Sequence, residues 1–168
     1  EPGEMLVVKP SGEVSRNRYW SLLERAEAAM TNPWRGTPDE AVDAAEALIS
    51  DATRLRLVSD VPLGAMLSGG VDSSTVVAMM QRHSSNAVRT FSIGYTEEDY
   101  DEAPHARAVA EHLGTDHTEL IAQPADALAV IPLLPDIFDE PFGDMSGVPT
   151  YLVSTLARQH VTVALGGD

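Results

Sequence analysis

The segment Ser68–Ser74, which reads Ser-Gly-Gly-Val-Asp-Ser-Ser, carries the residue types best suited to chemistry in this sequence. It follows an apolar run, and its two glycines let the backbone approach a ligand where a Cβ atom would obstruct it. The helix that we expect to begin here points its free N–H groups and its dipole into the same space, which favours an anion. Ser68, Ser73 and Ser74 add hydroxyl donors. The segment is therefore predicted to bind phosphate groups.

An acid inside a phosphate site, Asp72, needs an accompanying cation. We therefore expect Asp72 to hold Mg²⁺ against the phosphate oxygens, since this ion is commonly bound by one or two carboxylates together with phosphates. The segment lacks the lysine of G-x-x-x-x-G-K-[ST] and does not fit G-x-G-x-x-G. Ser-Gly-Gly-x-Asp-Ser resembles instead the PP-loop of ATP pyrophosphatases, which cleave ATP between the α and β phosphates and release pyrophosphate.

Strands and helices alternate along the part of the chain that must position this segment. Strands are predicted at Val61–Leu67, Val88–Ile93, His117–Ile121 and Val161–Leu165. Helices are predicted over 37–58, from Val71, over 101–113, from Pro124 to the prolines 132 and 135, and over about 150–160. Such alternation implies right-handed crossovers and an α/β fold, a parallel sheet with helices on both faces. Residues 68–74 and 166–168 should then lie side by side at the carboxyl edge of the sheet, which looks cut short where the sequence stops.

Two parts of unequal character are expected along the chain. Residues 1–36 read as a junction, with a strand-like run at Met5–Val8 and a Pro- and Gly-bearing linker at 31–36. Residues 37–168 read as one domain, which begins at the capping box of Thr37 and Glu40 with proline between them at the first helical position.

Composition excludes several function classes. Asp and Glu number 26 against 11 Lys and Arg, a formal net charge of −15, which argues against a nucleic-acid partner. Cysteine is absent, which removes disulfides, thiolate zinc sites and cysteine nucleophiles from this stretch. No apolar run is long enough to cross a bilayer, and residues 1–20 do not resemble a signal peptide. We expect a cytoplasmic protein without nucleic-acid or membrane partners.

The sequence around the loop resembles the glutamine-hydrolysing asparagine synthetase family. The matching positions are 54–64, 90–95, 100–102 with 106 and 110, 113–117, 139–142 with 144, 146 and 149–151, and 161–168, and residues 2–3 and 18–20 resemble the family's junction. The resemblance covers nearly the whole chain and places it in the N-terminal part of the family's C-terminal synthetase domain, which has an adenine-nucleotide α-hydrolase-like (PP-loop ATPase) fold. It implies a ligase of asparagine biosynthesis. ATP would adenylate the side-chain carboxylate of aspartate, giving β-aspartyl-AMP and pyrophosphate, and ammonia freed from glutamine by an amidotransferase domain would displace AMP.

The same resemblance assigns roles by position. Pyrophosphate binding falls to the loop, whose members are Ser68, Gly69, Gly70, Val71, Asp72, Ser73 and Ser74. Leu67, Ile93 and the turn Gly166-Gly167 would hold adenosine, although the family usually has serine at the position of Gly166. Asp168 falls where the family has an acid near the substrate. The implied small molecules are ATP, Mg²⁺, aspartate and ammonia, and a homodimer of the full-length protein stays open.

The same resemblance implies that two parts of the family's protein are missing from this chain. Residues 1–36 would be the junction that follows a glutaminase domain, and this chain lacks that domain. The chain also stops before the helical portion that supplies much of the aspartate site. We therefore expect the chain by itself to make no asparagine.

Two alternatives remain open from the sequence. One is a related carboxylate-adenylating ligase, of the β-lactam synthetase or peptide-cyclase type, and the other is a nucleotide-binding module without catalysis. Asp139, Glu140 and Asp144 could approach the site, but an acidic loop is more often a solvated connection. His117 is expected to be exposed rather than catalytic.

Overall fold

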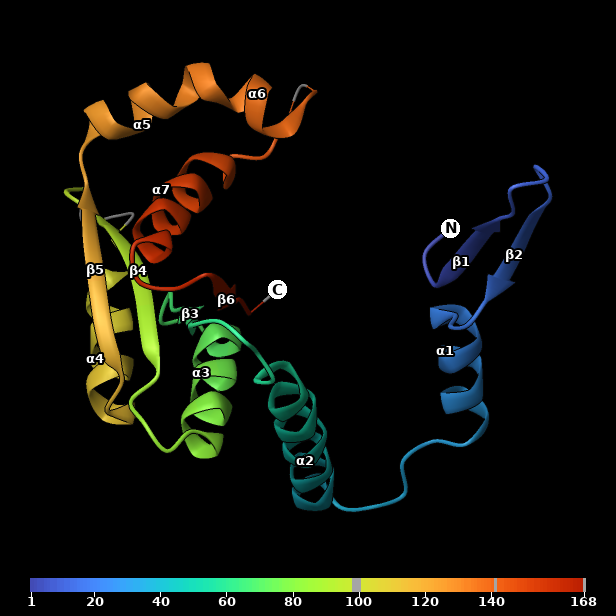
Figure 1. Ribbon diagram of the computed structural model, residues 1–168. Coiled ribbons are helices and arrows are strands. Elements are labelled where there is room, and N and C mark those ends of the chain that lie inside the picture. Colours follow the sequence, from blue (N-terminus) through green and yellow to red (C-terminus); the bar gives the residue numbers. More distant parts are fainter. Residues whose placement is uncertain (98–100, 141, 168) are drawn as a thin grey trace. The chain divides into compact units, whose positions relative to one another are not determined.

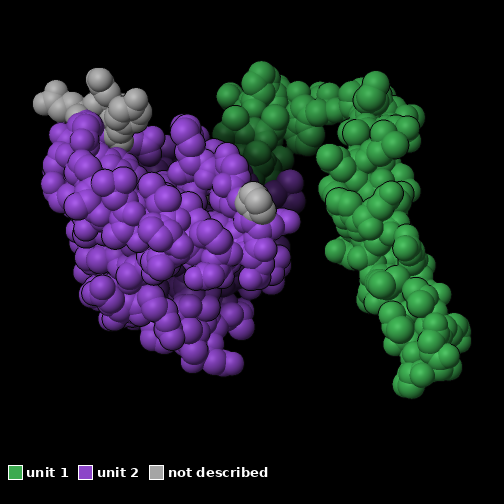
Figure 2. Space-filling model, turned by 90° about the horizontal axis from the view of Figure 1, so that it is seen from above, with its two compact units in different colours: residues 1–45 green, residues 46–168 purple. Residues whose placement is uncertain are grey.

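The computed structural model describes residues 1–97, 101–140 and 142–167. It divides the chain into two compact units, Glu1–Ala45 and Glu46–Asp168, which Figure 2 colours separately. The division falls inside helix α2 (Pro38–Arg56). The predicted domain boundary lies in front of the same helix, between residues 36 and 37, and that assignment of domains stays a prediction.

The first unit begins with a hairpin of β1 (Glu4–Val8) and β2 (Val14–Arg18), which pair antiparallel, and continues into α1 (Leu22–Thr31). The strand-like run at 5–8 is thus part of β1. The sequence analysis took the region as a junction and predicted neither β2 nor α1.

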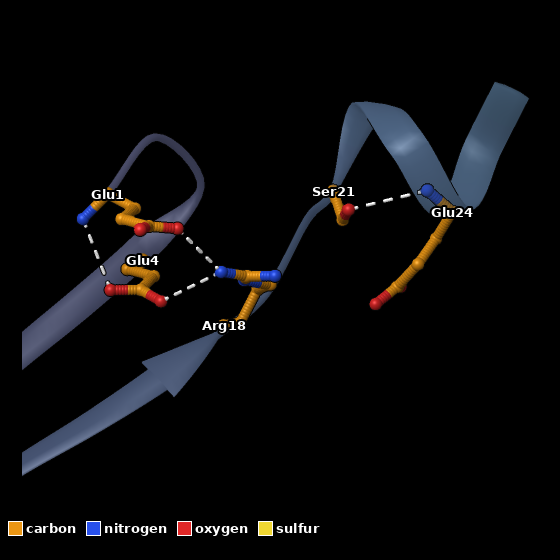
Figure 3. Close-up of polar contacts among 5 residues, drawn as sticks. All are labelled: Glu1, Glu4, Arg18, Ser21 and Glu24. Carbon is orange, nitrogen blue, oxygen red and sulfur yellow. Dashed lines mark hydrogen bonds and ion pairs between the residues drawn. The ribbon is translucent and has the colours of Figure 1, made fainter.

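Polar contacts hold the ends of these elements (Figure 3). Arg18 at the end of β2 donates to Glu1 at 2.9 Å and to Glu4 at 3.1 Å. The Ser21 hydroxyl accepts the backbone N–H of Glu24 and so caps α1, because it satisfies an N–H that has no partner within the helix.

The predicted capping box starts α2. The Thr37 hydroxyl accepts the N–H of Glu40 at 3.2 Å, and the Glu40 carboxylate accepts the N–H of Thr37 at 2.7 Å. These reciprocal bonds satisfy two backbone donors at the helix start.

The second unit contains one parallel sheet in the strand order β5-β4-β3-β6. The strands are β3 (Leu63–Met66), β4 (Arg89–Tyr95), β5 (Asp116–Ala122) and β6 (Val163–Leu165). The helices between them are α3 (Val71–His83), α4 (Ala103–Leu113), α5 (Pro124–Val130), η2 (Ile131–Leu133), α6 (Leu134–Phe138) and α7 (Gly147–Arg158). The predicted α/β fold with four parallel strands is confirmed.

Helices cover both faces of this sheet (Figure 1). On one face, Ala65 and Leu67 pack against Val77 of α3 and Ala106 of α4. On the other face, Phe91 of β4 packs against α7 through two buried side chains, Val153 and Ala157. The side chains of a strand alternate between the faces, so β3 supplies Ala65 to one core and Met66 to the other.

The order of the strands creates a switch point between β3 and β6. From β3 the chain moves through α3 to β4 and through α4 to β5, and it then returns past β3 to form β6 on the far side. Ligands of open α/β sheets bind outside the carboxyl ends of the strands at such a point. The two loops that leave β3 and β6 start here, so they are neighbours as predicted.

The helix predicted from Pro124 ends ahead of Pro132, because α5 ends at Val130. The sequence did not predict the two short helices that follow, although Pro132 and Pro135 each lie in the first turn of one, η2 and α6. Proline is tolerated there, since the N–H that it lacks would have no helical partner anyway. For the same reason α7 includes Pro149 and begins at Gly147 rather than near Thr150. Across the described ranges, no helix combines the length and apolar character that a membrane span requires.

The packing of α3 gives a prediction with a control on the same helix. Val77 is fully buried and Val71 is 81% exposed. Val77→Ala should lower the free energy of unfolding by about 2 kcal/mol, because apolar contacts are lost and a cavity remains. Val71→Ala should change it by less than about 0.5 kcal/mol. Urea unfolding of both variants checks the assignment, and equal losses would contradict the stated orientation of α3.

Candidate functional site

A pocket of about 270 Å³ opens at the carboxyl ends of β3, β4 and β6, where the sheet has its switch point. Its lining comes from these strand ends, the loop after β3, the start of α4, one turn of α7 and the loop after β6. The lining residues are Met66, Leu67, Ser68, Gly70, Asp72, Ser73, Phe91, Ser92, Ile93, Glu102, Val153, Gly166 and Gly167. The pocket therefore joins segments that are up to about a hundred residues apart.

The loop after β3 is held by its own serines. The Ser73 hydroxyl accepts the N–H of Ser68 at 3.2 Å and lies 3.0 Å from the Ser68 hydroxyl. Ser68 Oγ also accepts the N–H of Gly70 at 3.3 Å. These bonds close the turn between β3 and α3. Two of the three hydroxyls predicted to bind phosphate, those of Ser68 and Ser73, are thus already bonded within the loop.

Helix α3 begins with backbone donors that face no partner. Gly70 is its N-cap and supplies no side chain, and the first intrahelical bond runs from the N–H of Ser74 to the carbonyl of Gly70 at 3.0 Å. Within the part of the chain that the structure describes, the N–H groups of Val71, Asp72 and Ser73 have no hydrogen-bond acceptor. Free N–H groups at a helix N-terminus favour an anion.

Two glycines permit the close approach of backbones around the pocket. Gly69 has φ +83°, and a Cβ there would lie 2.6 Å from Ala106 N at the start of α4. A Cβ at Gly167 would lie 2.6 Å from Ser73 N on α3. The loop after β6 is therefore in contact with the first turn of α3, which puts the two predicted loops side by side.

Two acids, Asp72 and Glu102, line the pocket. The pKa of Tyr95 at the end of β4 is raised, mostly by burial and to a smaller extent by the negative charge of Glu102. Among the described residues, no group of three or more His, Cys, Asp or Glu is placed to hold a metal ion. A cation at this pocket would therefore take part of its ligands from a bound molecule.

The pocket brings together most, but not all, of the residues that the sequence analysis selected. Leu67, Ser68, Gly70, Asp72, Ser73, Ile93, Gly166 and Gly167 line it, and Gly69, Val71 and Ser74 do not. Ser74 Oγ is instead buried, with no hydrogen-bond partner among the described residues. Asp168 lies outside the described residues. The binding roles of all these residues stay predictions.

Five lining residues were not selected from the sequence: Met66, Phe91, Ser92, Glu102 and Val153. A signal existed for three of them, because 90–95 and 100–102 are stretches that carry the family resemblance. Val153 gave no signal, since it is one apolar residue of an apolar helix and reaches the pocket only because α7 covers this face of the sheet.

His117 is half-buried, so the expectation that it is exposed is wrong. It faces β4, where its Nδ1 lies 2.9 Å from Thr90 Oγ1 and its Nε2 lies 3.1 Å from Ser92 Oγ. Thr90 Oγ1 lies in turn 2.9 Å from Thr115 Oγ1. Burial lowers the pKa of His117, while the nearby charges of Glu119 and Arg107 act in opposite directions.

The acids at 139, 140 and 144 are exposed and do not line the pocket. Asp144 accepts the N–H of Ser146 at 2.8 Å, and hydrogen bonds to Ser146 hold the pKa of Asp144 below its usual value. Asp139 ends α6 with φ 59°. Both residues thus act locally at helix ends.

Comparison with known proteins identifies the family to which this chain belongs. The model of the family described as asparagine synthase matches residues 44–168, which is most of the chain, so the chain belongs to the asparagine synthase family. A putative glutamine-hydrolysing asparagine synthetase 2 of Methanocaldococcus jannaschii is 45% identical over 128 residues, 76% of this chain and 25% of that protein. The glutamine-hydrolysing asparagine synthetase 1 of Bacillus subtilis is 30% identical over 168 residues, 100% of this chain and 25% of that protein.

The chain thus spans about a quarter of the length of these curated relatives. Among solved structures, an ammonia-dependent NAD synthetase of Campylobacter jejuni is similar, with a TM-score of 0.53 at 13% identity over 75% of this chain and 56% of that chain. At this identity the likeness concerns the fold. It supports the PP-loop ATPase fold that the loop sequence indicated.

The crowding at Gly69 gives a prediction with Gly114 as its control. Both glycines have positive φ, +83° and +68°, but a Cβ at Gly114 would meet nothing within 4 Å. Gly114→Ala should cost about 1–2 kcal/mol from backbone strain alone. Gly69→Ala should cost about 1–3 kcal/mol more, because its methyl group would overlap α4. Denaturant unfolding measures both, and equal costs would show that α4 does not crowd the loop.

The burial of His117 gives a prediction about pH. Its pKa is lowered in the folded chain, so below about pH 6.5 the unfolded chain binds a proton that the folded chain resists. The free energy of unfolding should therefore fall as the pH drops below about 6.5. His117→Gln should remove this part of the slope, as measured by urea unfolding between pH 5 and 8. His112→Gln, at an exposed position of α4, is the control, and an equal change of slope in both variants would contradict the prediction.

Proposed function

We propose that this chain forms the ATP and pyrophosphate site of a ligase that adenylates the side-chain carboxylate of aspartate and then amidates it to asparagine. The observation that carries the proposal is the pocket at the switch point of the sheet, with the N-terminus of α3 at its base. The names of the relatives, asparagine synthetase, support aspartate as the carboxylate. The ammonia would come from glutamine elsewhere in the protein.

The pocket offers different surroundings to the two ends of ATP. Apolar side chains from the strand ends and α7, among them Leu67, Phe91 and Val153, suit the adenine ring. The N–H groups of Val71, Asp72 and Ser73 suit the phosphates. The phosphates would therefore lie over the loop after β3, and the adenosine would lie toward β4 and α7.

The donor set fits Mg²⁺. Asp72 and Glu102 provide carboxylate oxygens, and the residues that line the pocket include no Lys or Arg to neutralise a triphosphate. Mg²⁺ is usually bound by one or two carboxylates together with phosphate oxygens, which suits a site without a cluster of three acids. We propose that Asp72 holds the ion, whose contribution when bound is to neutralise charge on the departing pyrophosphate.

The proposed reaction has two balanced steps. In the first, an oxygen of the aspartate side-chain carboxylate bonds to the α-phosphorus, and the bond from this phosphorus to the bridging oxygen breaks, so that pyrophosphate leaves with the electron pair. In the second, ammonia attacks the acyl carbon, AMP leaves, and one proton is released. The chain contributes positioning and charge stabilisation to the first step rather than a nucleophile.

Asp72→Asn tests the proposal. It removes the negative charge and keeps the shape of the side chain, which is exposed, so the free energy of unfolding should change by less than about 0.5 kcal/mol. Aspartate-dependent ATP–pyrophosphate exchange in the full-length protein should fall by more than about tenfold, which corresponds to more than about 1.4 kcal/mol of barrier. Exchange that stays within tenfold of the wild type would refute the assigned role of Asp72.

Asp60→Asn is the matched control, because Asp60 is also exposed but precedes the amino end of β3, away from the pocket. This variant should exchange at the wild-type rate. The substrate is tested on the wild type with a panel of carboxylates. Exchange that requires a carboxylate other than aspartate would keep the ATP site but refute aspartate as the substrate.

A further inference from the structure

A series of hydrogen-bonded side chains connects β5 to β4 beside the pocket. It runs from Thr115 Oγ1 to Thr90 Oγ1 at 2.9 Å, on to His117 Nδ1 at 2.9 Å, and from His117 Nε2 to Ser92 Oγ at 3.1 Å. Thr90 and His117 are direct neighbours in the register of the two strands. The imidazole therefore lies between two hydroxyls of the same neighbouring strand.

The two hydroxyls that contact His117 are buried. Thr90 is 0% exposed and Ser92 is 3% exposed, so neither can exchange its partner for bulk water. A buried hydroxyl without a partner is costly, and the two nitrogens of His117 supply the partners. A neutral imidazole has one donor and one acceptor nitrogen, and a hydroxyl can complement either.

The two ends of this hydrogen-bonded series, Ser92 and Thr115, lie at different cavities. Ser92 lines the pocket at the switch point, directly before Ile93. His117 and Thr115 line a second cavity of about 380 Å³ between α4 and β5, together with charged residues of both elements. His117 thus connects the outer edge of the sheet to the strand end that forms one wall of the pocket.

We propose that His117 is a positioning residue for nucleotide binding, which acts through the bond from its Nε2 to Ser92 and so holds the end of β4 against the nucleotide. The inference rests on the proposed ATP site. His117 does not itself line that pocket, so its effect on the ligand must pass through Ser92. Its other nitrogen bonds Thr90, which does not line the pocket either, and this bond serves the sheet alone.

The two nitrogens can be tested separately. Glutamine places an amide the same number of bonds from Cα as Nε2, and asparagine places one the same number of bonds from Cα as Nδ1. His117→Gln therefore keeps a partner for Ser92, and His117→Asn keeps a partner for Thr90 only. A purely structural role predicts the same nucleotide binding by both variants once they are folded.

The experiment measures ATP–pyrophosphate exchange of the full-length protein with varied ATP. His117→Gln should keep the KM for ATP within about twofold of the wild type. His117→Asn should raise it by about five- to tenfold, the usual weight of one hydrogen bond, with kcat within about twofold. Ser92→Ala should raise the KM by the same factor. The double variant Ser92→Ala with His117→Asn should be no worse than either single variant, because both remove one contact.

Three results would overturn the inference. The first is an equal KM in the Gln and Asn variants, the second is a fall in kcat without a change in KM, and the third is additive effects in the double variant. A wild-type chain that binds no ATP in equilibrium dialysis would instead refute the proposed function, and the inference with it. A wild type that binds ATP while all the variants bind it equally well would refute the inference alone.

Discussion

The arrangement around the pocket depends on two places where a backbone lies against the first turn of a helix. Gly69 lies against α4, where an added Cβ would come within 2.6 Å of Ala106 N, and Gly167 lies against α3, within 2.6 Å of Ser73 N. Each contact ties the loop at the end of one strand to the start of a helix. A side chain at either position would separate them, so these contacts set how closely β3, β6 and the two helices frame the pocket.

Hydrogen bonds within the loop after β3 determine which of its polar groups remain free for a ligand. Ser68 and Ser73 bond to each other and to the loop backbone, so their hydroxyls shape the turn first. The N–H groups at the start of α3 remain available, because glycine at the N-cap has no side chain to accept from them. The serines of the motif therefore build the turn, and in the proposed function the backbone N–H groups would be the phosphate donors.

Local patterns predicted the sheet and the loop, and non-local contacts account for what was missed. β3 and β6 lie in short apolar runs, and the loop after β3 is one continuous segment, so both can be identified within a few residues. The environment of His117 depends instead on its register with Thr90, 27 residues earlier. Val153 reaches the pocket because the chain crosses back over the sheet. The helix η2 was missed for a local reason, because a proline that follows the end of one helix can also begin the next.

Charge gives the last constraint on the site. The chain has a formal net charge of −15, and two carboxylates line a pocket whose lining includes no Lys or Arg. A triphosphate entering such a site meets unfavourable Coulomb terms that the three N–H groups of α3 offset only in part, since a helix N-terminus acts as about half a charge. In the proposed function, a divalent cation held by Asp72 would reverse the sign of the charge there and make the acid favourable. Nucleotide and cation are therefore proposed to bind this site as one unit.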